Sequence, residues 1–117
     1  MPDEMLELAH TIVDALEQKK GEDILLLDLT GIASFTSMFV ICSGGSERTL
    51  KALSNEVRRV IKENYSLQPT QVEGEPGSGW VLLDYGGVIL HLFSPDRRDY
   101  YALEQLWADG RVVLRMA

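Results

Sequence analysis

The stretch from Gly79 to Pro95, GWVLLDYGGVILHLFSP, consists of two short apolar runs on either side of Gly86-Gly87. This pattern predicts a β-hairpin, because glycine can adopt the positive φ angles that two-residue turns require. A two-residue turn places Tyr85 opposite Val88 and thereby fixes the register of every other pair in the hairpin. The two faces of the hairpin can therefore be assigned from the sequence.

One predicted face is almost entirely aliphatic, and we expect it to lie against helices; it holds Val81, Leu83, Tyr85, Val88, Leu90 and Leu92. The other face, called the mixed face below, holds Trp80, Leu82, Asp84, Ile89, His91 and Phe93. It is too polar for a core, yet its aromatic and aliphatic side chains form a patch that proteins usually reserve for a partner. We interpret it as a docking surface. The alternative is that another element covers this face, with Asp84 and His91 satisfying buried polar groups or each other.

The remaining chain supplies three predicted helices and two further strands. Apolar residues at helical spacing predict a helix from Asp3 to Lys20, and Ser46 is a candidate N-cap for a second helix that follows it. A third helix is expected within residues 94–110, which begin with Ser-Pro and end with Asp-Gly. The segments 23–29 and 37–43 are apolar on both faces, as strands inside a covered sheet are.

The predicted order is α-β-β-α-β-β-α, which indicates an α/β (α+β) fold with helices packed on a mixed β-sheet. With 117 residues, 45% of them hydrophobic, the chain is expected to form one domain over residues 1–117. Residues 65–79 are predicted to be a surface loop, with room for a short strand near Gln71–Glu73. For the tail, residues 110–117, an edge strand and a frayed end both remain open.

The charge balance favours a basic partner. The chain carries 18 acidic and 11 basic residues, a net charge of -7, which opposes non-specific attraction to bare nucleic acid. Its single cysteine, Cys42, lies in an apolar run and is expected to be a buried thiol. The acidic N-terminal segment resembles neither a secretion signal nor a transit peptide, so we expect a cytoplasmic protein with no membrane contact.

An enzymatic function has weak support in the sequence. The turn Gly44-Gly45-Ser46 could hold a phosphate at a helix start, as in nucleotidyltransferases, but those enzymes also need paired metal-binding carboxylates on a strand. No Asp-x-Asp or Glu-x-Glu pair occurs on a predicted strand, and two histidines with one cysteine give no zinc spacing. We therefore predict no catalytic residue, metal or cofactor, and keep a nucleotide-binding enzyme as the alternative. Arg97 and Arg98 beside aromatic residues leave contact with RNA open.

Three segments in order carry a resemblance to a known family: DILLLDLTGIASFTSMFVICSGGSERTLKAL at 23–53, GWVLLDYGGVILHLFSP at 79–95 and RDYYALEQLW at 98–107. Together they closely resemble the ribosomal silencing factor (RsfS or iojap) family over nearly the whole chain. This chain has Gly87 where family members commonly carry an acidic residue at the turn. The resemblance implies a nucleotidyltransferase-like fold without the catalytic carboxylates, and a binding protein rather than an enzyme.

The resemblance also implies a partner and a mechanism. Such proteins dock on large-subunit ribosomal protein fourteen, block joining of the small subunit and repress translation under nutrient limitation; they form homodimers when free, and contact with ribosomal RNA is left open. On this basis, the mixed face becomes the docking surface, with the following helix at its margin. The expected partner contacts are Trp80, Leu82, Asp84, Tyr85, His91, Phe93, Tyr100, Tyr101 and Glu104.

Overall fold

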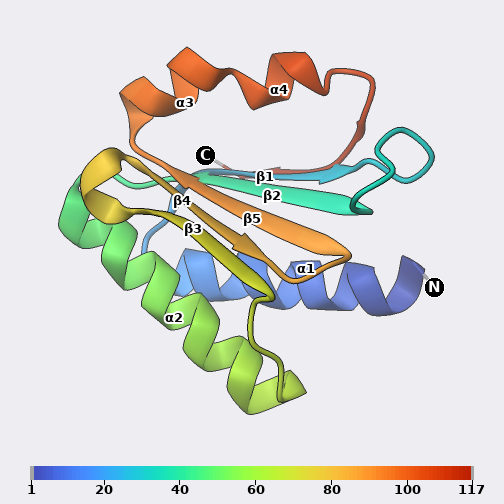
Figure 1. The fold of residues 1–117 in the computed structure, drawn as a ribbon, viewed down its shortest axis with the longest axis horizontal. Coiled ribbons are helices and arrows are strands. Elements are labelled where there is room, and N and C mark those ends of the chain that lie inside the picture. The colour runs from blue at the N-terminus through green and yellow to red at the C-terminus, as the bar shows by residue number, and fades with distance from the viewer. Residues whose placement is uncertain (1, 117) are drawn as a thin grey trace.

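The computed structural model describes residues 2–116 as a six-stranded mixed sheet with helices on both faces (Figure 1). The helices are α1 (Pro2–Gln18), α2 (Glu47–Tyr65), the 3-10 turn η1 (Pro76–Ser78), α3 (Pro95–Tyr101) and α4 (Leu103–Leu106). The strands are β1 (Glu22–Asp28), β2 (Met38–Ser43), β3 (Gln71–Glu75), β4 (Trp80–Asp84), β5 (Val88–Phe93) and β6 (Arg111–Met116). The predicted α/β (α+β) class with a mixed sheet is confirmed.

The strands lie in the order β3-β4-β5-β2-β1-β6. Only the central pair, β2 and β5, is parallel, and every other neighbouring pair is antiparallel. The parallel pair brings the end of the hairpin beside the apolar strand β2, with Phe93 opposite Ser43. The hairpin therefore lies near the middle of the sheet, where both of its faces can be covered.

The hairpin register is the one that the Gly86-Gly87 turn predicts. Leu83 pairs with Leu90 and Leu82 with His91, and the backbone N–H of Tyr85 donates to the carbonyl of Val88 at 2.9 Å. Gly86 has a φ of 89°, and its N–H donates to the Asp84 carboxylate at 2.7 Å. A positive φ at the first turn position matches the right-handed twist of the flanking strands, and so it permits the tight connection.

The aliphatic face of the hairpin packs against α1 and α2, as predicted. It joins the inward residues of β1 and β2 and the apolar stripes of both helices in one buried core. Ile12 and Leu16 of α1 and Leu53 and Val57 of α2 are each no more than 2% exposed in that core. Cys42 is buried there too, as expected, and burial raises the pKa of its thiol to about 12.

The opposite face of the sheet carries a second, smaller core beneath α3 and α4 (Figure 1). Leu25, Leu27, Phe39, Ile41 and Phe93 form its floor, and Trp107 packs on them. The mixed face of the hairpin belongs to this side. Its β5 residues are covered, as the alternative that another element covers this face predicted. Its β4 residues lie half-exposed at the border of the core.

Two elements differ from the sequence-based expectation, and a third decides between the two alternatives left open for the tail. The third helix is two short helices, because Ala102 between them adopts a left-handed conformation with φ 48° and ψ 48°. The predicted surface loop contains the strand β3, which includes the short strand expected near Gln71–Glu73, extends to Glu75 and pairs along β4 at the edge of the sheet. The tail forms the edge strand β6 against β1. Within residues 2–116, no helix is long and apolar enough to cross a membrane.

Candidate functional site: an aromatic patch with an acidic border

Trp80 lies at the centre of an aromatic cluster on the mixed face. Its ring centroid is 5.1 Å from that of Phe93 in a stacked arrangement, and 4.4 Å from that of Tyr101. Trp80 is half-buried, Phe93 is only 1% exposed and Tyr101 is 39% exposed. Phe93 therefore supports the patch from beneath, while Trp80 and Tyr101 present ring surface to solvent.

His91 is a buried part of this cluster. It is 4% exposed, and its Nδ1 accepts a hydrogen bond from Nε1 of Trp80 at 3.3 Å. Its ring also stacks on Phe93 at 6.0 Å and meets Phe39 edge-on at 4.5 Å. Burial lowers the pKa of His91 to about 4, so the ring is neutral at pH 7. In this arrangement His91 orients Trp80, and the direct partner contact expected of it stays a prediction.

Within residues 2–116, no hydrogen bond or ion pair joins Asp84 to His91. The carboxylate of Asp84 instead accepts from the N–H of Gly86 at the turn, and Asp84 pairs with Ile89, two residues before His91. Tyr85 points to the opposite side of the sheet, into the core under α1 and α2, as its place in the register predicts. Burial raises the pKa of Tyr85 to about 12, and among the described residues its hydroxyl has no hydrogen-bond partner.

A shallow hollow of about 280 Å³ opens beside Trp80. Its lining residues come from β3, η1, β4 and α3 and comprise Glu73, Gly74, Ser78, Trp80, Leu82, Arg97 and Tyr101. Because directly paired antiparallel residues share a face, β3 sets Gln71 beside Asp84, Glu73 beside Leu82 and Glu75 beside Trp80. Glu73 on the edge strand β3 therefore gives the apolar floor of the hollow an acidic border, and Arg97 on α3 is the cation among the lining residues.

Sequence reasoning missed this acidic border, because it treated β3 largely as loop. One signal was available in the alternation Gln71-x-Glu73-x-Glu75, which places three polar side chains on one face of a strand. Gly74 allows the close pairing, since a Cβ at that position would overlap the carbonyl oxygen of Trp80. Its φ of 75° also belongs to the region that glycine tolerates best.

Glu104 lies at the margin of the site but has a structural partner. Its carboxylate accepts hydrogen bonds from Arg98 at 2.9 and 3.3 Å, and Arg115 lies 3.7 Å away. Arg98 is itself only 6% exposed and also donates to Ser43 Oγ at 2.9 Å and to the carbonyl of Asp23. This ion pair holds α3 and α4 against the sheet. Tyr100, by contrast, is 74% exposed and meets Tyr101 edge-on at 5.1 Å.

The aromatic cluster extends further than the sequence indicated. Phe39 of β2 contacts Trp107 edge-on at 6.0 Å, and Phe35 in the β1–β2 connection meets Trp107 at 5.8 Å. Phe35 is 56% exposed. Aromatic side chains thus run across the sheet face from Tyr100 to Phe35. Distant segments contribute them, so no local motif could have revealed the continuity.

The Gly44-Gly45-Ser46 turn has a structural explanation. Ser46 is the N-cap of α2, as predicted, and its Oγ accepts from the N–H of Thr49 at 3.1 Å. A Cβ on Gly44 would lie 2.8 Å from the side chain of Leu50, so packing requires glycine there. The nearby hollow includes the carboxylates of Glu47 and Asp96 and the single cation Arg97, so the net negative charge of its lining disfavours a phosphate. Within residues 2–116, no cluster of three potential metal-binding side chains occurs.

Known proteins share this fold and sequence pattern. A crystal structure of a protein from Chromobacterium violaceum superposes with a TM-score of 0.84 and 34% sequence identity, covering 97% of this chain and 92% of that one. The ribosomal silencing factor RsfS of Halalkalibacterium halodurans is 38% identical over 107 residues, which are 92% of this chain and 91% of that protein.

A more distant relative has a name that refers to the large subunit. The mouse protein named mitochondrial assembly of ribosomal large subunit protein 1 is 32% identical over 98 residues, which are 82% of this chain and 43% of that protein. The sequence model described as "Ribosomal silencing factor during starvation" matches residues 2–116. The chain therefore belongs to the RsfS family of ribosomal silencing factors.

Proposed function

We propose that this protein binds the large ribosomal subunit through large-subunit ribosomal protein fourteen and thereby blocks joining of the small subunit. Membership of the silencing-factor family supports a ribosome-associated role. The protein would act in the cytoplasm when nutrients are scarce. The action requires occupancy of the subunit face and no chemical turnover.

The observation that carries this proposal is the patch around Trp80. It combines exposed aromatic surface from Trp80 and Tyr101 with the half-exposed Leu82 and the acidic border at Glu73. Aromatic residues in the centre of an interface supply most of its binding energy, whereas charges at its edge determine which partner approaches. Such a patch fits an apolar spot on a basic protein.

The buried residues beneath the patch make it rigid before docking. Phe93 and His91 hold the indole of Trp80 from below, and Tyr101 flanks it on α3. Because Trp80 is already held in place, little side-chain entropy would be lost on binding. The proposed contacts are therefore divided between an exposed group (Trp80, Leu82, Asp84, Tyr100 and Tyr101) and a supporting group (His91 and Phe93).

Co-sedimentation with purified large subunits tests the proposal. We expect the wild type to travel with the subunit and Trp80→Ala to bind about 30-fold more weakly, the equivalent of about 2 kcal/mol for a central aromatic residue. Leu67→Ala is the matched control, because Leu67 is an exposed apolar residue in the segment after α2. Thermal unfolding of both variants establishes that they are folded. Equal binding of all three proteins would contradict the assignment of the surface.

A charge reversal on the border separates electrostatics from packing. Glu73→Lys changes an exposed side chain and should leave folding intact while weakening binding to a basic partner. The control is Asp14→Lys, the same charge change on the exposed side of α1. If a subunit-joining assay with added small subunits shows equal inhibition by wild type and Glu73→Lys, the acidic border has no role in docking.

A further inference from the structure

The positive charge of this acidic protein is concentrated on α2. This helix carries five of the 11 lysines and arginines, but only three of the 18 acidic residues. Outside α2, acidic side chains greatly outnumber basic ones. The helix therefore has a net charge opposite in sign to that of the rest of the molecule.

Four of the five basic residues lie along one flank of α2. Arg48, Lys51, Arg58 and Lys62, together with Asn55, follow one another three or four residues apart, the spacing that aligns side chains on one helix face. All five are exposed. Between residues 2 and 116, none of these four cations has an ion-pair partner. We call these five residues the basic stripe.

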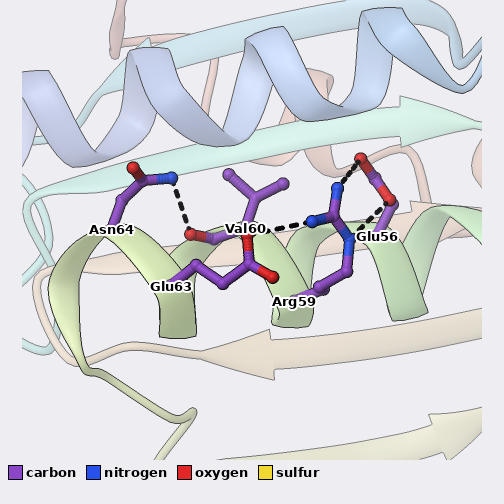
Figure 2. Close-up of polar contacts among 5 residues, drawn as sticks. All are labelled: Glu56, Arg59, Val60, Glu63 and Asn64. Carbon is purple, nitrogen blue, oxygen red and sulfur yellow. Dashed lines mark hydrogen bonds and ion pairs between the residues drawn. The ribbon is translucent and has the colours of Figure 1, made fainter.

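The fifth cation of α2, Arg59, is neutralised. Figure 2 shows its guanidinium between Glu56, at 2.8 Å, and Glu63, at 3.0 Å. At 100° per residue, both carboxylates lie on the opposite flank from the basic stripe. Two of the three acidic residues of α2 are thus paired away from the stripe, and the third, Glu47, lies in the first turn of the helix.

Stabilisation of the helix dipole explains only part of this arrangement. A cation in the last turn, such as Lys62, interacts favourably with the negative end of the dipole. Arg48 lies in the first turn, where the dipole disfavours a cation, and Lys51 is in the next turn. The basic stripe therefore runs along the whole helix without a structural benefit at its start.

A hollow of about 250 Å³ lies at the C-terminal end of the basic stripe. Arg58, Arg59 and Lys62 line it with Gln68 and Pro69, and no carboxylate of the described residues takes part. A second hollow, of about 380 Å³, contains Lys51, Asn55 and Arg58 but also Glu47 and Glu75. The positive charge is therefore least compensated in the first hollow, which Arg58 and Lys62 help to line.

We propose that the basic stripe of α2 binds the phosphate backbone of RNA, with Arg58 and Lys62 as the principal contacts. The inference rests on the proposed function, because the ribosomal subunit would supply the RNA. The stripe extends about 21 Å along the helix at 1.5 Å per residue, long enough to follow several phosphates. It contains no apolar side chain, whereas the centre of a protein interface needs apolar or aromatic residues. Phosphate contacts need only positive charge and hydrogen-bond donors.

The salt dependence of binding to large subunits tests this proposal. The stripe variant is Arg58→Gln/Lys62→Gln, and the control is Lys19→Gln/Lys20→Gln, which removes the same charge from exposed positions in the turn after α1. A plot of the logarithm of the association constant against the logarithm of the salt concentration has a negative slope. Loss of two phosphate contacts should make this slope less steep by about 2, whereas the control variant should keep the wild-type slope. Between about 50 and about 200 mM salt, this is a difference of roughly 12-fold. Equal slopes for wild type and stripe variant would overturn the proposal.

A photo-crosslinking amino acid at position 58 identifies the partner directly. Nuclease-sensitive crosslinks to RNA support the proposal, and crosslinks to an acidic protein overturn it. Failure of the wild type to bind subunits would contradict the proposed function rather than the stripe. In that case, retention of the protein on immobilised duplex RNA at low salt tests RNA binding by the stripe. Stronger retention of the wild type than of the stripe variant would support the proposal, and equal retention would overturn it.

Discussion

His91 makes the stability of the fold sensitive to mild acid. Its pKa is lowered by burial from 6.5 to about 4, so between these values the unfolded chain binds a proton that the folded chain does not. The free energy of unfolding should therefore be fully retained above pH 6.5 and fall as the pH decreases towards 4. We expect a loss of about 2 kcal/mol between pH 7 and pH 5, measured by denaturant titration.

Two variants separate this effect from other titrations. His91→Gln removes the buried ring, and its unfolding free energy should change much less between pH 7 and pH 5, although it starts lower at pH 7. His10→Gln alters an exposed histidine on α1 and should keep the wild-type profile. A steep profile that persists in His91→Gln would show that another group is responsible.

Gly87 leaves room for a side chain from α1, an element far from it in the sequence. A Cβ at this position would overlap Sδ of Met5 on α1, so a residue larger than glycine does not fit here without movement of that side chain. We expect Gly87→Ala to lower the unfolding free energy by about 1 kcal/mol, because overpacking forces neighbours from their preferred positions.

The double variant Gly87→Ala/Met5→Ala gives the crucial comparison. If Met5 is the obstacle, Gly87→Ala should cost much less in the Met5→Ala background than in the wild type, a coupling that thermal melts of the four proteins can measure. Additive effects would place the strain in the turn backbone instead.

At the scale of elements, Arg98 joins α3 and α4 to two strands. Its bonds to Glu104, to Ser43 and to the backbone of Asp23 are made by a nearly fully buried side chain. Arg98→Met should destabilise the protein by about 3 kcal/mol, because it leaves buried acceptors without their donor. Arg97→Met, at the exposed neighbouring position, should change stability little. Similar melting temperatures for the two variants would argue against this role of Arg98.

The elements differ in how well their sequences predict them, for physical reasons. The hairpin is predictable down to its pairs, since a two-residue glycine turn fixes the register and alternation does the rest. The break at Ala102 is not, because alanine carries no local signal for the left-handed conformation that it adopts there. β3 and β6 lie at the edges of the sheet and bury little, so their sequences lack the strong apolar alternation of the hairpin.

For the site, the sequence indicated which residues share the mixed face but not how deeply each of them is buried. Alternation places Trp80, His91 and Phe93 together, yet only the packing of α3 and α4 decides that His91 and Phe93 lie below the surface. The net charge of -7 likewise suggested a basic partner. It concealed the basic stripe, because a sum over the chain cancels charges that the fold separates onto different surfaces.

At the scale of the whole molecule, we propose that the patch around Trp80 also serves self-association, as the family resemblance suggests for the free protein. An apolar patch that is self-complementary can pair two copies about a twofold axis. Dimer formation and subunit docking would then compete for the same surface, and the free dimer would act as a store of inactive protein.

Competition makes a specific prediction about concentration and valency. Trp80→Ala should weaken both self-association, measured by analytical ultracentrifugation, and binding to large subunits, whereas Leu67→Ala should change neither. Wild-type protein bound to subunits should be present as one copy per subunit, measured by quantitative mass spectrometry of the sedimented complex. Above the dimer dissociation constant, most added protein forms dimers, so the concentration of free monomer rises less than proportionally with total protein. The fraction of subunits that carry the protein should therefore also rise less than proportionally. Two copies per subunit, with the dimer intact, would show that the two interfaces are separate.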